Sequence, residues 1–344
     1  MGIERSSRLT RRLLLGCFWL AAVGHAEPTS DATILGPSEQ SARIDEFRLR
    51  LTSYYQDGHG YQSKAGTLAG PGSERTLIVQ PMMLVGIRQT ARIHHEVVVP
   101  LDIVSAASAN ALDVVSHASA VNEAIGIELT SRFELSDDDR LTSNLAWHEE
   151  EPFGSGSFGL GYSRSLADDN ASLGISGQAT FDRFDNLHPD GTRHGRRNRT
   201  ALNGNLSFLQ LLSPTTVFDA SYGLTFQQGT LETTYNSVPV SGGASRSNEL
   251  FPHTRTRHAV QARVAQHLPG SHTTLRASYR YYTDTFQLDA HTTEFELHQY
   301  LFPWLIARGS FRYYTQTGVN FFSTALPLQE SPLSPRTADS DLAK

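Results

Sequence analysis

The sequence predicts an all-β fold, an antiparallel transmembrane β-barrel of about 14 strands that follows a signal peptide. Segments of about ten residues alternate polar and apolar side chains, as strands do when one face meets water and the other meets lipid. The links between these segments are short and long in turn, and the N-terminus has the pattern of an export signal. The expected location is the outer membrane of a Gram-negative bacterium, with its lipid as the surrounding partner.

Residues 1–26 have the three parts of a secretory signal peptide. Arginines precede the apolar run at residues 13–23, and Gly24 and Ala26 supply the small residues before the expected cleavage site. The run is too short for a transmembrane helix, which needs about 20 apolar residues. A lipoprotein signal ending at Cys17, the only cysteine, is the alternative, although few apolar residues precede it. Residues 27–42 are expected to form a polar periplasmic linker.

The barrel is expected to occupy residues 43–325. In its first strand, residues 43–55, Phe47 and Leu49 face one side and Arg48 and Arg50 face the other. Further strands of this kind are predicted at residues 75–85, 91–105, 124–135, 141–149, 157–165, 172–184, 200–211, 216–227, 257–267, 273–283, 291–301 and 305–316.

The lengths of the links favour a membrane barrel over a soluble β-sandwich, because outer-membrane barrels alternate short periplasmic turns with longer extracellular loops. Short links are predicted at residues 86–90, 136–140, 166–171, 212–215, 268–272 and 302–304. Longer links are predicted at residues 56–74, 106–123, 185–199 and 228–256. The links at residues 150–156 and 284–290 are short for their side.

Two near-copies of one short stretch, at residues 102–108 and 113–119, begin within the predicted strand at residues 91–105 and are followed by Glu123. The distinctive residues of this family-like motif are Asp102, Ser105, Ser108, Asp113, Ser116, Ser119 and Glu123. This stretch resembles the bacterial family catalogued as domain of unknown function 3570. The Arg-x-x-x-Tyr-Tyr stretch at Arg50 and the Arg-Tyr-Tyr repeats at Arg280 and Arg312 are similar to the family's pattern too. The resemblance implies an outer-membrane barrel of unassigned function, and it transfers no catalytic residue.

The resemblance does not decide whether the barrel has its closing strand. Residues 335–342 are similar to a run that leads into closing strands in relatives, so residues 326–344 are interpreted as a tail that begins a truncated closing segment. The barrel would then lack its closing strand. The alternative is that residues 319–325 form a short fourteenth strand, followed by a disordered tail.

Charged residues share the face opposite the apolar one on several predicted strands, and we call them the lumen charge ladder. Its members are Arg276, Arg280, Glu294, Glu296, His298, Arg308 and Arg312, together with Arg48, Arg50, Arg92, Glu96, Glu128 and Arg132 on earlier strands. These columns either line a water-filled pore and set its solute preference, or neutralise one another and hold the lumen shut. The close interleaving of the two signs favours the shut lumen.

The remaining features predict no catalysis. The net charge of −6 provides no field that attracts nucleic acid, and the histidines are scattered without metal-ligand or nucleophile spacing, so we expect no metal, no cofactor and no enzyme. A basic loop at residues 185–199 either binds phosphates of surface glycolipid or is simply solvated. The expected function is a narrow small-solute or ion channel. The alternative is a non-conducting scaffold for an unidentified envelope or secretion partner, and an outer-membrane hydrolase is the least favoured interpretation.

Overall fold

The structure is a computed structural model that describes residues 42–56, 59–64, 67–73, 76–105, 122–150, 153–187, 193–232, 237–240, 246–326 and 334–344. The predicted signal peptide and nearly all of the predicted linker lie outside these residues. So do Ser108, Asp113, Ser116 and Ser119 of the family-like motif. The chain divides into two units, Met1–Gln40 and Ser41–Lys344, and the fold described below is that of the second.

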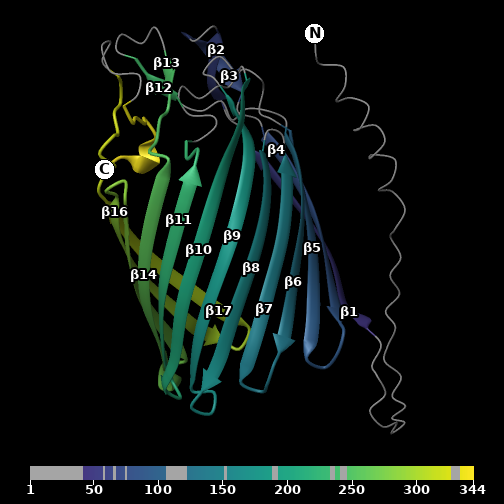
Figure 1. The fold of residues 1–344 in the computed structure, drawn as a ribbon. Helices are drawn as coiled ribbons and strands as arrows, with labels where there is room; N and C mark the ends of the chain where they lie inside the picture. The colour runs from purple at the N-terminus through teal and green to yellow at the C-terminus, as the bar shows by residue number, and fades with distance from the viewer. Residues whose placement is uncertain are drawn as a thin grey trace. The chain divides into compact units, whose positions relative to one another are not determined.

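The second unit is built on one antiparallel sheet of 13 strands, in which each strand pairs with the next one along the sheet (Figure 1). The sheet curls, which carries β16 and β17 behind β10 and β11 in the view. The strands are β1 (Arg43–Gln56), β4 (Thr76–Arg88), β5 (Ile93–Ser105), β6 (Asn122–Glu134), β7 (Asp139–Glu150), β8 (Phe153–Leu166), β9 (Ala171–Leu187), β10 (Arg193–Ser213), β11 (Thr216–Gly229), β14 (Thr254–Leu268), β15 (Thr273–Asp284), β16 (Asp289–Phe302) and β17 (Leu305–Gln316). Each predicted strand overlaps one of these, so the antiparallel all-β fold is confirmed.

The two ends of this sheet are β1 and β17, and no ladder joins them in the described part of the chain. Every described side chain of β17 from Leu305 to Thr315 is exposed, as an edge strand requires. Among the described residues, no helix is long and apolar enough to span a membrane.

The register of the ladders gives the sheet two chemically different faces. Leu275 lies opposite Leu297, whereas the next residue, Arg276, lies opposite Glu296. Because successive side chains of a strand point to opposite faces, the ladders sort apolar residues onto one face and charged residues onto the other. We call these the outer face and the lumen face.

The short links lie together at the lower end of the sheet in Figure 1, which we call the turn end. They are residues 89–92, 135–138, 167–170, 214–215, 269–272 and 303–304. The turn at residues 135–138 shows the local chemistry, because the Ser136 hydroxyl oxygen accepts hydrogen bonds from the backbone N–H groups of Asp138 and Asp139. The opposite end, with the longer links, is the loop end.

The predicted long loops contain more strand than the sequence indicated. Residues 56–74 include the hairpin β2 (His59–Lys64) and β3 (Thr67–Ser73), and residues 228–256 include β12 (Ser237–Pro239) and β13 (Arg246–Asn248). The bounds predicted for the loop at residues 185–199 were wrong, because β9 continues to Leu187 and β10 begins at Arg193, with residues 188–192 outside the described residues. Strands that extend out of the lipid into water need no apolar face, so their backbone hydrogen bonding can continue between polar residues.

The predicted fourteenth strand at residues 319–325 is not formed. This stretch has no two-residue alternation, since Phe321 and Phe322 are adjacent and cannot both face lipid. It folds instead against the loop end, where isolated bridges join Phe322 to Thr337 and Leu250 to Arg336. The described part of the tail is therefore ordered.

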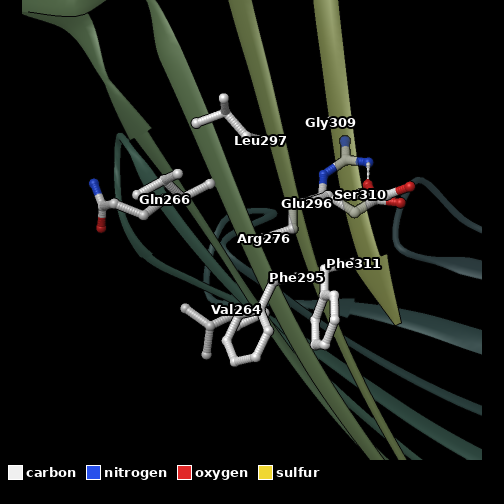
Figure 2. Close-up of a pocket in the computed structure, with 11 residues that line it drawn as sticks. Val264, Gln266, Arg276, Phe295, Glu296, Leu297, Gly309, Ser310 and Phe311 are labelled. Carbon is white, nitrogen blue, oxygen red and sulfur yellow. Dashed lines mark hydrogen bonds and ion pairs between the residues drawn. The ribbon is translucent and has the colours of Figure 1, made fainter. Parts of the chain in front are cut away.

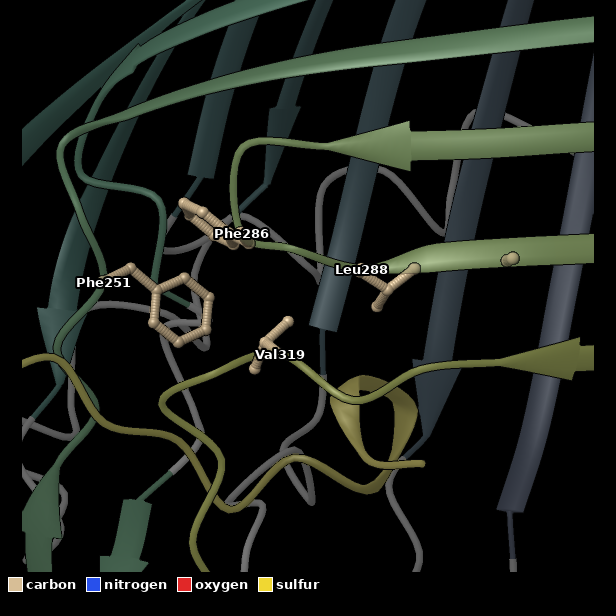
Figure 3. Packing of buried hydrophobic residues seen from close by; sticks show 5 residues of the cluster. Phe251, Phe286, Leu288 and Val319 are labelled. Atoms are coloured by element: carbon tan, nitrogen blue, oxygen red, sulfur yellow. The ribbon is translucent and has the colours of Figure 1, made fainter.

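These C-terminal residues complete a small apolar core at the loop end. Phe251, Phe286, Leu288 and Val319 are buried against one another (Figure 3), together with Ala290. We call residues 249–251, 284–290, 317–326 and 334–344 the loop-end cap. Tyr282, on the lumen face of β15, packs against the same core, so the cap is attached to the lumen face at this end.

Gly229 ends β11 in a conformation that other residues rarely adopt. Its φ is +118°, and an added Cβ would lie 2.3 Å from the carbonyl oxygen of Asn198. We therefore expect Gly229→Ala to lower the free energy of unfolding by about 1–3 kcal/mol, measured by urea denaturation of the folded barrel in detergent. Gly223→Ala is the control, because open space surrounds its Cβ position, and equal losses in both variants would contradict the explanation.

Candidate functional site: the lumen face

Part of the lumen face of β7 to β10 carries uncharged side chains around a hollow. Asn144, Gly159, Ser176, Gln178 and Asn203 line a hollow of about 550 Å³ there, which Glu128 of β6 borders. The Glu128 carboxylate accepts a hydrogen bond of 2.7 Å from the Asn144 side chain. This wall offers polar groups and space to a solute, but little charge.

The lumen face of β15 to β17 carries the main part of the lumen charge ladder. Glu296 is its centre, because its carboxylate lies 3.4 Å from Arg276 Nη1 and 3.0 Å from His298 Nε2, and it also pairs with Arg308 Nη2. The Glu296 side chain is 14% exposed, whereas that of Arg308 is 61% exposed. One shielded carboxylate thus holds several basic groups whose ends reach toward water.

The other ladder residues of these strands leave positive charge in excess. Glu294 lies opposite Arg312, and Arg280 lies opposite Thr292, but in the part of the chain that the structure describes neither arginine forms an ion pair. On the lumen face of β15 to β17 the four arginines Arg276, Arg280, Arg308 and Arg312 therefore face Glu294 and Glu296, because the third carboxylate, Asp284, pairs with Arg255 of β14. The same four arginines and two glutamates belong to the predicted ladder, but there the alternating signs suggested neutralisation.

The earlier strands contribute a more balanced set to the same face. Arg48 pairs with Glu46 beside it on β1, and Arg50 lies on the same side two residues further on. Glu96 of β5 lies opposite Thr130 of β6. Arg132 of β6 lies opposite His94 of β5 and Thr142 of β7 on the lumen face.

Arg92 does not belong to the lumen charge ladder, which corrects the prediction. The strand β5 begins one residue later, and Arg92 lies in the turn before it, where Nη2 is 3.1 Å from Asp137 Oδ1. Among the described motif residues, Asp102 lies opposite Ala124 on the lumen face, whereas Glu123 lies opposite Ile103 on the outer face. Ser105 ends β5.

A second polar cluster lies on the lumen face near the loop end, and the sequence reasoning missed it. The Asp284 carboxylate accepts hydrogen bonds from Arg255 Nε at 2.9 Å and from the Tyr282 hydroxyl at 2.6 Å. Arg199 Nε donates to Asp182 Oδ2 at 2.7 Å. Arg255 and Arg257 are separated from Arg263 by even numbers of residues on β14, so all three point to the same face. This spacing could have placed both arginines on the lumen face from the sequence alone.

The basic residues of the predicted glycolipid loop are divided between different places. Arg199 is held by Asp182 on the lumen face, whereas Arg196 and Arg197 are exposed near the end of the β9–β10 hairpin. His188 lies outside the described residues. In the described parts of the chain, no group of three or more histidine, cysteine or acidic side chains is arranged to hold a metal ion.

The outer face carries exposed apolar side chains along the middle of the strands. Phe295 is 53% exposed and Phe311 63% exposed, and with Val264, Leu275 and Leu297 they border a shallow hollow of about 610 Å³. Figure 2 shows Val264, Phe295 and Phe311 grouped together, apart from the ion pair of Arg276 and Glu296. A sheet with an apolar outer face and a charged inner face is the wall of an outer-membrane barrel, so the protein is located in the bacterial outer membrane.

The solved structures that are similar to the chain include two outer membrane proteins. An outer membrane channel from Pseudomonas putida F1 is 11% identical, with 83% of this chain and 100% of that chain covered, at a TM-score of 0.38. OmpT, an outer membrane protein of Vibrio cholerae, is 10% identical, with 81% and 90% covered, at a TM-score of 0.35. No curated protein matches the chain.

One family model matches residues 127–343, which is more than half of the chain. The matched region runs from within β6 through β17 to the loop-end cap, so it includes the basic part of the lumen charge ladder. The family resemblance expected from the sequence is thereby confirmed. The chain belongs to the family described as protein of unknown function (DUF3570).

Proposed function

We propose that this outer-membrane barrel is a narrow passage that favours small anionic solutes. The observation that supports it is the excess of arginine over glutamate on the lumen face of β15 to β17. A positively charged wall raises the local concentration of anions and lowers that of cations. The proposal involves no catalytic step.

The width of the sheet is compatible with a passage of this kind. Eight-stranded barrels are filled by their own side chains, whereas barrels of about 16–18 strands enclose an aqueous channel. The 13-stranded sheet lies between these sizes. Its lumen face combines the small side chains of β8 and β9 with the long arginines of β15 and β17, which leaves space beside the charged wall.

Ion selectivity in planar lipid bilayers tests the proposal. The full chain is expected to conduct with an anion-to-cation permeability ratio above one in a potassium chloride gradient. The double variant R276Q/R308Q is expected to lower this ratio by at least about twofold, because two exposed positive charges leave the lumen face. The ratio should also fall as salt concentration rises, since salt screens exposed charges.

R183Q is the matched control for the selectivity experiment. Arg183 lies on the outer face of β9, paired with Glu149 at 3.1 Å, and does not face the lumen. Its substitution should leave the permeability ratio unchanged. A wild-type channel that prefers cations, or one whose selectivity is the same in R276Q/R308Q, would contradict the proposal.

The loop-end cap favours a second candidate, a non-conducting membrane scaffold. The cap includes Ala290 of β16 and packs against Tyr282 on the lumen face of β15, at the end where solutes would enter. A scaffold predicts that neither the full chain nor a variant lacking residues 318–344 conducts. Conduction by the full chain would exclude this candidate.

A further inference from the structure

We propose that Arg257 binds a small oxyanion, a phosphate or carboxylate group, at a site on the lumen face just below the loop-end cap. The role of this site in permeation rests on the proposed function, but its binding chemistry does not. Arg257 lies on β14, between Thr225 of β11 and Asp284 of β15.

The two neighbouring arginines are already neutralised by carboxylates of their own. Arg255 pairs with Asp284, whose side chain is fully buried, and Arg199 pairs with Asp182. Asp182 also accepts a hydrogen bond of 2.8 Å from the Ser155 hydroxyl. These contacts hold both pairs in fixed positions on the lumen face.

Asp284 has no capacity left for Arg257, although the two residues are directly opposite in the ladder. Its Oδ2 accepts from Arg255 and from the Tyr282 hydroxyl, and its Oδ1 accepts from the backbone N–H groups of Phe286 and Leu288 at 2.8 and 3.2 Å. A carboxylate offers about four acceptor positions, which these bonds occupy.

Arg257 consequently makes no direct ion pair in the part of the chain that the structure describes, although Asp284 attracts it at longer range. It forms no ion pair or hydrogen bond there, and its Nε atom is buried with no partner. A buried guanidinium donor without an acceptor is costly, and the terminal nitrogens of Arg257, which are not among the buried atoms, are the donors that a ligand can reach.

Space for such a ligand lies next to Arg257 on the same face. Gly223 and Ala259 face each other in the next position of the ladder between β11 and β14. A Cβ added to Gly223 would have no other atom within 4 Å, so the lumen is open at this point.

The chemistry of the guanidinium group determines the class of ligand. Its donors form a planar fork that matches two oxygens of a carboxylate or a phosphate, and charge-assisted hydrogen bonds of this type are among the strongest in proteins. Arg199 and Arg255 contribute positive charge near Arg257, which the carboxylate of Asp284 partly offsets. A neutral sugar would leave the charge uncompensated, so we assign the site to an oxyanion.

Calorimetric titration of the folded full-length barrel in detergent with inorganic phosphate, and separately with acetate, tests the inference. At least one of the two is expected to bind at about one site per chain. R257Q should weaken that binding by about 10- to 100-fold, the effect of removing a charged hydrogen-bond donor. R257K should retain part of the affinity, because it keeps the charge but loses the fork.

R263Q is the matched control, since Arg263 lies on the same strand and face but is already paired with Asp219 at 2.6 Å. The affinity of R263Q for the anion should stay within about twofold of that of the wild type, because Arg263 is exposed and already paired. Heat-modifiable gel migration should show that each variant is folded. Absence of binding of both anions, or equal affinity in the wild type and R257Q, would overturn the inference.

The same titration separates this site from the proposed channel. Binding that survives R276Q/R308Q but not R257Q supports the site, whether or not the barrel conducts. Binding that is lost in R276Q/R308Q and kept in R257Q would move the anion to the lumen charge ladder and reject Arg257. A conducting, anion-selective barrel with unchanged binding in R257Q would leave the proposed function intact and remove only this inference.

Discussion

Asp284→Ala is expected to lower the free energy of unfolding by about 3–5 kcal/mol, the range found when one partner of a buried ion pair is removed. The Asp284 side chain is fully buried, and that of Arg255 is 10% exposed. Without the carboxylate, Arg255 stays buried above the Phe286 ring, 4.4 Å from its centroid, with no counterion. Tyr282 and the backbone N–H groups of Phe286 and Leu288 lose their acceptor as well.

Urea denaturation of the folded protein in detergent, followed by tryptophan fluorescence, measures this loss. Asp219→Ala provides the comparison, because Asp219 and Arg263 form an ion pair whose side chains are 25% and 47% exposed. Such a pair contributes below about 1 kcal/mol. If the two variants lose similar stability, the Asp284 cluster does not hold the loop-end cap in the way described.

Phe295→Arg is expected to lower the stability of the barrel in lipid by about 2–4 kcal/mol, the cost of an arginine on the lipid side near the middle of a transmembrane strand. Phe295 lies near the centre of β16 on the outer face, opposite Ala277 and Phe311. The guanidinium group would meet hydrocarbon there. Urea titration of the protein folded into lipid vesicles gives the difference from the wild type.

Ser278→Arg is the control for orientation. Ser278 lies on the lumen face between Glu294 of β16 and Arg263 of β14. A new arginine would meet water, the Glu294 carboxylate and an arginine whose charge is already paired with Asp219. We expect a change within about 0.5 kcal/mol. The reverse order, a harmless F295R and a damaging S278R, would show that the charged face is the one that meets lipid.

The strands and their faces were predictable because they follow from a local rule. The two-residue period places Arg276 and Phe295 on opposite faces whatever the rest of the chain does. The strand at residues 305–316 was predicted with the bounds of β17 for the same reason. The pairing of Arg276 with Glu296 also follows, once a short turn sets the register between neighbouring strands.

The loop end was not predictable in this way, because its structure depends on contacts between distant segments. Arg336 exchanges backbone hydrogen bonds of 2.7 and 3.0 Å with Leu250, and no pattern near either residue indicates this. The sequence did not predict that β9 and β10 continue beyond residues 184 and 200, because polar residues outside the lipid show no alternation of hydropathy. The isolation of Arg257 depends on how Asp284 distributes its bonds, which is a property of the folded cluster.

The odd number of strands in the sheet has a geometric consequence for its two edges. In a meander each strand reverses the direction of the one before it, so β1 and β17, the first and last of 13, run the same way. A direct seam between them would be a parallel ladder, with evenly spaced and slanted hydrogen bonds, in a sheet that is otherwise antiparallel throughout. Only a strand that runs in the opposite direction, from the loop end to the turn end, can form antiparallel ladders with both edges at once.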